Sequence, residues 1–255
     1  MIGVYDSGVG GLSVWKELYG LMPAEDFIYF ADNAHCPYGD KPIEYIRDRA
    51  RRVTSFFADK GAEIVVVACN TATAAAIDML RSEFSVPFVG MEPAIKPAAV
   101  ATKSGVVGIL ATANTFKGSI YKHTREEFAS DIKVIEVVGH GLVEAVESSQ
   151  IPYSLLERYV GEIVGQGADV IVLGCTHFPF LQDQIQKIAG NDVLVINPAP
   201  AVARHTAKLL GYENKYFSSS IGKNLFYSSG SSDSLKGVLS NLCPFDPDLF
   251  HAELE

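Results

Sequence analysis

Eight short runs of β-branched and aliphatic residues recur along the chain in two sets of four, separated by stretches with helical periodicity. The first set covers 2–6, 27–32, 63–69 and 86–90, and the second covers 106–110, 133–138, 170–175 and 193–197. Their length and composition are typical of buried strands. Strands that alternate with helices predict parallel sheets with helices on both faces. We therefore expect an α/β fold of two pseudo-symmetric, doubly wound parallel-sheet units.

The third run of each set ends in a cysteine at nearly the same spacing. Cys69 lies 67 residues after the start of its set, and Cys175 lies 69 residues after the start of the other. We expect a helix to begin directly after each cysteine, where the helix dipole lowers a thiol pKa from about 8.5 toward neutrality. A buried strand-end cysteine is also a common inert core residue. Polar residues favour a pocket instead, and they follow both cysteines: Asn70, Thr71, Thr176 and His177.

Composition narrows the function classes. The net charge of -9, without clustered Lys and Arg, disfavours nucleic-acid binding. No apolar run reaches the roughly 18 residues of a membrane span, and the chain opens on "MIGVYDSG" without a cleavable leader, so we expect a cytoplasmic protein with no membrane partner. The four cysteines form no CxxC pair, which predicts neither a metal site nor a disulfide frame. We expect Cys36 and Cys243 to be non-catalytic, because neither has a matching context.

The first run leads into a glycine-rich turn, "DSGVGGL" from Asp6, and the second run ends in Asp32. This imitates a dinucleotide-binding fingerprint, although Ser13 replaces the third glycine and Asp6 would repel a pyrophosphate. The same turn could offer backbone N–H groups to a smaller anion such as a carboxylate. Asp6 and Asp32 could instead cap local turns. We expect Asp6 to share a crevice with Cys69 if the first and third strands are neighbours.

Four motifs resemble the signatures of glutamate racemases, within the aspartate and glutamate racemase superfamily. They are "DSGVGGL" from Asp6, "DNAHCPYG" from Asp32, "VVACNTA" from Val66 and "LGCTHFPFL" from Leu173. The resemblance implies a cofactor-independent enzyme that makes D-glutamate for peptidoglycan, with its active site in a cleft between two domains. The first domain would comprise 1–94 plus a returning tail, 207–255, and the second 95–206. The tail's apolar residues predict a packed strand and helix: Phe217, Phe226, Leu235, Val238 and Leu239.

The resemblance also implies residue roles. Cys69 would exchange the α-proton of D-glutamate and Cys175 that of L-glutamate, assisted by Asp6 and His177, because inversion needs one acid–base group on each face of the α-carbon. The substrate-binding residues would be Ser7, Asp32, Tyr38, Gly39, Asn70, Thr71, Glu147 and Thr176. Glu147 lies in "GHGLVEAVE", a segment that lacks the cysteine–proline pair usual in the family. The alternative is that Glu147 is an ordinary glutamate on the surface of a helix.

Other functions stay open at this point. A racemase of aspartate or another acidic amino acid is the nearest alternative, because the cysteines determine the reaction and the pocket determines the side chain. A nicotinamide-dependent oxidoreductase and a non-catalytic binder of small anions are more distant ones. The residues are compatible with a homodimer but do not decide the oligomeric state.

Overall fold

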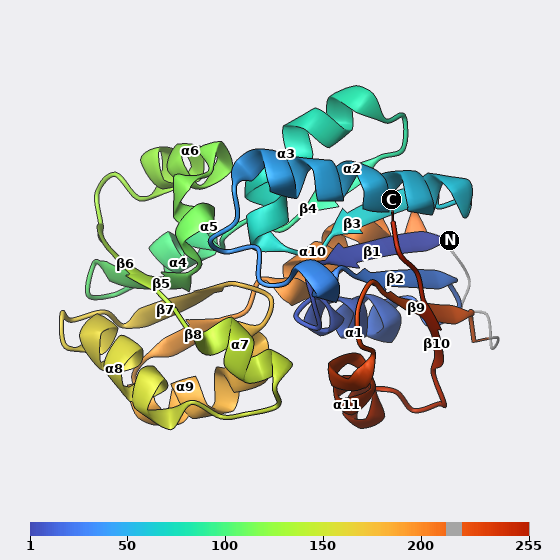
Figure 1. Ribbon diagram of the computed structural model, residues 1–255. Coiled ribbons are helices and arrows are strands. Elements are labelled where there is room, and N and C mark those ends of the chain that lie inside the picture. Colours follow the sequence, from blue (N-terminus) through green and yellow to red (C-terminus); the bar gives the residue numbers. More distant parts are fainter. Residues whose placement is uncertain (213–220, 255) are drawn as a thin grey trace.

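The computed structural model describes residues 1–212 and 221–254, and within them the chain forms two parallel sheets that lie side by side (Figure 1). The first sheet has the strand order β10-β9-β2-β1-β3-β4, and the second has the order β6-β5-β7-β8. The strands span β1 (Ile2–Asp6), β2 (Phe27–Ala31), β3 (Ile64–Val67), β4 (Phe88–Gly90), β5 (Val106–Ala111), β6 (Lys133–Val138), β7 (Val170–Gly174), β8 (Leu194–Ile196), β9 (Asn224–Ser228) and β10 (Asp248–His251).

The eight predicted strands are confirmed, with ends that differ by up to two residues. The order β2-β1-β3-β4 in the first sheet matches β6-β5-β7-β8 in the second, so the repeat seen in the sequence is a repeat of topology. Strands β1 and β3 are neighbours, with Tyr5 paired to Val67. The ends of β1 and β3 therefore meet at one edge, as expected for parallel strands.

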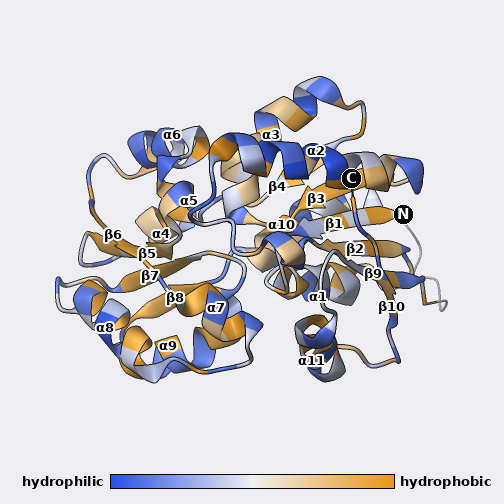
Figure 2. Cartoon of the chain, in the orientation of Figure 1, coloured by the Kyte–Doolittle hydropathy of each residue, from blue (hydrophilic) through white to orange (hydrophobic). Residues whose placement is uncertain are grey.

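Helices cover both faces of each sheet. They span α1 (Leu12–Leu21), α2 (Ile43–Asp59), α3 (Asn70–Glu83), α4 (Ile95–Ala101), α5 (Ala113–Lys117), α6 (Ser119–Phe128), α7 (Leu142–Glu147), α8 (Tyr153–Val164), α9 (Gln182–Ala189), α10 (Ala199–Leu209) and α11 (Asp233–Leu242), with single 3₁₀ turns η1 (Asn33–His35) and η2 (Phe178–Leu181). Successive strand side chains point to opposite faces. Thus Val4 packs in the cluster that holds α1, α10 and α11, whereas Tyr5 packs in the cluster of α2 and α3. Figure 2 shows the resulting hydrophobic strands between helices with hydrophilic outer faces.

The chain returns to the first sheet after α10. Strand β9 pairs in parallel with β2, and β10 pairs with β9. The expected strand and helix in the tail are confirmed, with Phe226, Leu235 and Leu239 buried and Val238 packed against them. The Phe217 prediction lies outside the described residues.

Helix α10 joins the two halves, because it packs against α1 although it follows the second set of strands. The division into 1–94 plus 207–255 and 95–206 stays a prediction. Within the described residues, no helix is both long and apolar enough to cross a bilayer.

Candidate active site

The first cysteine lies where β3 meets α3. Cys69 is the N-cap of α3, and its Sγ accepts a hydrogen bond from the backbone N–H of Ala72 at 3.4 Å. The same sulfur lies 3.8 Å from the hydroxyl of Ser7, which follows β1. The helix expected after Cys69 is confirmed, and the side chain is buried.

The second cysteine follows β7 in a different local structure. Cys175 does not lead directly into a helix, because η2 begins only at Phe178 and α9 at Gln182. The helix expected after Cys175 is therefore confirmed over Gln182–Ala189, but the expectation that it starts directly after the cysteine is wrong. Pro179 is of a type favoured in the first turn of an α-helix, but here it lies in a short 3₁₀ turn. Cys175 is buried, and its Sγ lies 3.8 Å from Nδ1 of His177.

Hydrogen bonds join the loop that holds Cys175 to the end of β1 and the start of α1 in the first half. Thr176 donates its hydroxyl proton to Oδ2 of Asp6 at 3.0 Å, and Ser13 donates to the carbonyl of Thr176 at 2.9 Å. Asp6 is fully buried and also accepts from the N–H of Gly8. Repulsion from a charged Cys175 would add to the factors that raise the pKa of Cys69.

Glu147 ends α7 and turns its carboxylate inward to His177. Its Oε1 lies 2.7 Å from Nε2 of His177 and accepts from the backbone N–H of Val9 at 2.7 Å. Glu147 is thus not a freely solvated surface glutamate, since only 18% of its side chain is exposed. These contacts hold the imidazole from the side opposite Cys175. Direct contact between Glu147 and a substrate stays a prediction.

Burial and neighbouring groups shift the pKa values of Asp6, His177 and Cys69. It raises the pKa of Asp6 to about 6, against the lowering effects of His177 and the Gly8 N–H. Burial disfavours a charged imidazole, yet hydrogen bonds to Cys175, Cys36 and Glu147 raise the pKa of His177 well above its ordinary value. Burial and then the charge of Asp6 raise the pKa of Cys69, and the N–H at the cap does not offset them. The prediction that the pKa of Cys69 is lowered is therefore wrong for the protein without bound substrate.

The glycine-rich turn packs against catalytic candidates from the other half. A Cβ on Gly8 would lie 1.9 Å from Oε1 of Glu147, and one on Gly10 would lie 2.3 Å from Nδ1 of His177. Only glycine permits this approach. The N–H groups of Gly8 and Val9 are occupied by the carboxylates of Asp6 and Glu147, so the turn binds anions, but they are the protein's own. This overturns the dinucleotide interpretation, because side chains fill the space that a pyrophosphate needs.

Asp32 is fully buried away from solvent and bonded within the protein. Arg49 donates to both of its oxygens, at 2.8 and 2.9 Å, and the hydroxyl of Tyr38 donates to Oδ2. Tyr5 donates to the Tyr38 hydroxyl in turn. The described contacts give Asp32 a structural role, and its contact with a substrate stays a prediction. Gly39 follows this network and lies beside Thr112 of the second half.

Asn70 and Thr71 open α3 beside Cys69. Both are buried, and neither Nδ2 nor Oδ1 of Asn70 has a hydrogen-bond partner among the described residues. Buried amides are almost always paired, so this orphaned group points to a ligand. The hydroxyl of Thr71 pairs with that of Thr112 at 2.8 Å.

Sequence reasoning missed Thr112 and Asn114, which bring the second half to the Tyr38 loop. Asn114 donates to the carbonyls of Tyr38 and Lys41, at 3.1 and 3.0 Å. A signal was available, because the polar run "TANT" follows β5 just as the glycine-rich turn follows its counterpart β1. Cys36 also lies near the site, with its Sγ 3.7 Å from Glu147.

The chain is similar to characterised families over most of its length. A model of the Asp/Glu/Hydantoin racemase family matches residues 17–206. The glutamate racemase of Stutzerimonas stutzeri is 44% identical over 243 residues, which cover 93% of this chain and 92% of that protein.

Two solved structures are similar throughout. Glutamate racemase isoform RacE1 from Bacillus anthracis has a TM-score of 0.87 at 29% identity and covers 100% of this chain and 97% of its own. Escherichia coli glutamate racemase, solved with L-glutamate and the activator UDP-MurNAc-ala, has a TM-score of 0.87 at 32% identity, covering 100% of this chain and 98% of its own. These similarities agree with the α/β fold described above.

Proposed function

Because the chain belongs to the Asp/Glu/Hydantoin racemase family, we propose that it is a glutamate racemase that interconverts L- and D-glutamate through two cysteine thiols, without a cofactor. The extent of its identity to glutamate racemases favours glutamate over the aspartate alternative. Its product would be the D-glutamate used for peptidoglycan.

The observation that carries the mechanism is the pair of buried thiols at matching strand ends of the two sheets. Racemisation removes the α-proton from one face of the amino acid and returns a proton to the other face, so two acid–base groups are required. A thiolate and a thiol serve this purpose, because they exchange roles when the direction reverses. Cys69 follows β3 of the first sheet and Cys175 follows β7, the matching strand of the second sheet.

Each thiol has a neighbouring group that can assist it. His177 faces Cys175 through Nδ1, and Glu147 holds its other nitrogen. Asp6 adds negative charge near Cys69 and is bonded to the second cysteine loop through Thr176. We assign Asp6 and His177 to proton handling and Glu147 to positioning His177.

Substrate binding would activate Cys69. A bound amino acid brings an ammonium group, and a nearby positive charge lowers a thiol pKa. The raised pKa of Cys69 in the protein alone thus protects the thiol until substrate arrives. The α-proton of D-glutamate goes to Cys69 and that of L-glutamate to Cys175.

We assign the polar groups around the thiols to the substrate carboxylates and ammonium. Asn70 is supported by its unpaired buried amide, which can both donate and accept. Hydroxyls and backbone N–H groups would complete the shell, from Ser7, Thr71, Thr176, Tyr38 and Gly39. We further expect a cytoplasmic enzyme with no nucleic-acid or membrane partner. A homodimer is compatible with this role.

The test is direct. The purified chain, dialysed against chelator, is incubated with L-glutamate or L-aspartate, and the loss of optical activity is followed by circular dichroism. We expect glutamate to lose its signal without pyridoxal phosphate, nicotinamide or metal. Faster loss with aspartate would make the chain an aspartate racemase, and no loss with either would favour the non-catalytic binder. A strict requirement for an added cofactor would refute the two-thiol mechanism.

A further inference from the structure

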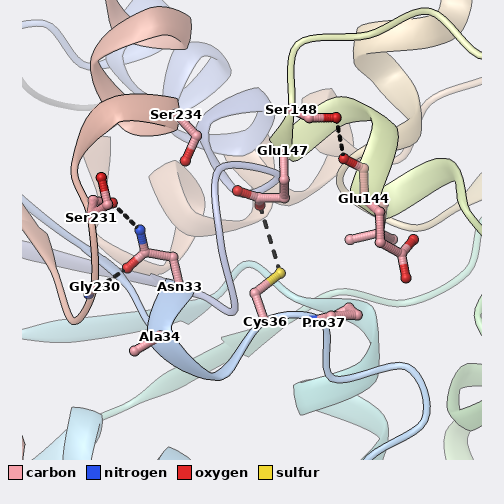
Figure 3. A pocket seen from close by; sticks show the side chains of 11 residues that line it. Asn33, Ala34, Cys36, Pro37, Glu144, Glu147, Ser148, Gly230, Ser231 and Ser234 are labelled. Carbon is pink, nitrogen blue, oxygen red and sulfur yellow. Dashed lines mark hydrogen bonds between the residues drawn. The ribbon is translucent and has the colours of Figure 1, made fainter.

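Three potential metal ligands from separate elements meet beside the proton-handling histidine. Cys36 follows η1, Glu147 ends α7, and His177 follows β7. The thiol sulfur, a carboxylate oxygen and a ring nitrogen lie within 4.8 Å of one another. Figure 3 shows Cys36 and Glu147 pointing toward each other across the pocket. A thiol, an imidazole and a carboxylate form a ligand set typical of zinc.

The spacing of the three ligands suits a tetrahedral ion. Zinc–ligand bonds of ~2.3 Å to sulfur and ~2.1 Å to nitrogen and oxygen place a sulfur and an oxygen about 3.6 Å apart, and a nitrogen and an oxygen about 3.4 Å apart. Cys36 Sγ is already 3.7 Å from Glu147 Oε1. The contact of 2.7 Å between Glu147 and His177 must open by only about 0.7 Å. Small side-chain rotations therefore suffice.

Two of the three ligands, Cys36 and Glu147, are accessible from solvent, and the buried His177 lies behind them in contact with Glu147. Cys36 and Glu147 line a pocket of about 410 Å³ between η1, α7 and the β9–α11 loop. The exposed residues Ser148 and Ser231 lie at the same pocket. An ion can reach the ligands by this route, and the pocket has room for a water molecule as the fourth ligand.

We propose that Cys36, Glu147 and His177 form an inhibitory site for a thiophilic divalent cation such as Zn²⁺. A sulfur ligand selects such ions over Mg²⁺ and Ca²⁺, which prefer oxygen. Binding of the ion releases the protons of the Cys36 thiol and of Nε2 to solvent, so that the sulfur and the ring nitrogen can each donate a lone pair to the ion. The ion then takes the place of the hydrogen bond between Nε2 and Glu147, while Nδ1 still faces Cys175. His177 can then no longer gain or lose a proton at Nε2.

The inhibition rests on the proposed racemase function, and its kinetics follow from the geometry. The ion binds one edge of the imidazole ring, and Cys175 faces the other edge. Substrate and ion can therefore be bound together, and saturating glutamate does not relieve the inhibition. An ion bound directly by Cys69 and Cys175 would compete with substrate.

The test uses Co²⁺, whose bond to a thiolate gives a charge-transfer absorption in the near ultraviolet. The reduced full chain should bind one Co²⁺ with this absorption, and so should the control Cys243→Ala, whose thiol lies outside the cluster. Cys36→Ala should bind at least roughly tenfold more weakly, since loss of even an outer-shell partner costs 10–100-fold in affinity. Cys36→Ser, with a poor zinc ligand of similar size, provides a second variant if the alanine protein is unstable.

Racemisation is measured in parallel with Zn²⁺, each protein against its own metal-free rate. We expect inhibition of the wild type and Cys243→Ala that a chelator reverses, and at least tenfold lower sensitivity in the Cys36 variants. Equal Co²⁺ binding by wild type and Cys36 variants, or no thiolate absorption in the wild type, would overturn the site. If the wild type does not racemise glutamate at all, the proposed function fails, while Co²⁺ absorption still tests the site.

Discussion

Replacing Gly10 with alanine should impair the Cys175 side of the active site alone. The new Cβ would lie 2.3 Å from His177 Nδ1 and 2.7 Å from the Thr176 hydroxyl. An ordinary contact begins near 3.4 Å, so the imidazole must move by roughly 1.1 Å. Such overpacking costs about 1–3 kcal/mol of stability. A displacement of about 1 Å near reacting groups costs about 100-fold in rate, which equals ~2.7 kcal/mol of activation free energy.

The assay separates the two faces of the substrate. Racemisation needs both thiols, but elimination from a glutamate analogue with a leaving group on the β-carbon needs only abstraction of the α-proton. For Gly10→Ala we expect release of the leaving group from the L-form to fall about 100-fold, and release from the D-form to fall only a few fold. The control is Gly20→Ala in α1, where an added Cβ meets nothing within 4 Å. It should keep full activity and gain about 0.5–1 kcal/mol of stability.

Two outcomes would refute this reasoning. Equal loss with both enantiomers would mean that the glycine turn supports the whole site rather than one half. Unchanged rates in a folded Gly10→Ala protein would mean that His177 does not need its position beside Cys175. Thermal melts of both variants show whether the protein remains folded.

Three further results are expected. Cys36→Ser and Cys243→Ser should each racemise glutamate within a few fold of the wild type in metal-free buffer, and a loss of roughly 100-fold in a folded variant would show that the wrong thiols were paired. Arg49→Leu should lower the free energy of unfolding in urea titrations by about 3–5 kcal/mol, because it leaves a buried carboxylate without its partner. Arg51→Leu, at an exposed pair, should change it far less. Burial raises the pKa of Asp6 to about 6, so the folded state binds its proton more tightly than the unfolded chain. The contribution of Asp6 to the free energy of unfolding is therefore complete below pH about 4 and is lost as the pH rises to about 6. Asp6→Asn should gain stability over the wild type across that window, by ~3 kcal/mol at most, and an advantage that does not change with pH would contradict the shift.

The eight strands of the two repeats were accessible from the sequence because buried parallel strands are continuous apolar runs. The runs starting at Ile2 and Val106 have nearly the same spacing to their cysteines, and the matching strand order in the two sheets explains this repeat. The cysteines were accessible for a related reason. A polar group directly after a buried strand lies at the edge of the sheet where loops form sites.

Other features depend on contacts that no local pattern encodes. The partner of Asp32 is Arg49, on a helix that could equally face solvent. The hydrogen bond between His177 and the accepting carboxylate of Glu147 joins the loop after β7 to α7, and its formation depends on tertiary packing. The lowered thiol pKa expected from the helix dipole failed at Cys69, because burial and Asp6 act in the opposite direction and are stronger there.

The central claim is that the two thiols act on opposite faces of the substrate. The most direct measurement uses Cys69→Ser and Cys175→Ser with both enantiomers of the β-substituted glutamate analogue, following release of the leaving group. Neither variant should racemise glutamate, because a serine hydroxyl is too weak a base at neutral pH. Cys175→Ser should still release the leaving group from the D-form, and Cys69→Ser from the L-form. If one cysteine proved necessary for both enantiomers and the other for neither, a single base would serve both faces, and the two-thiol account would be wrong.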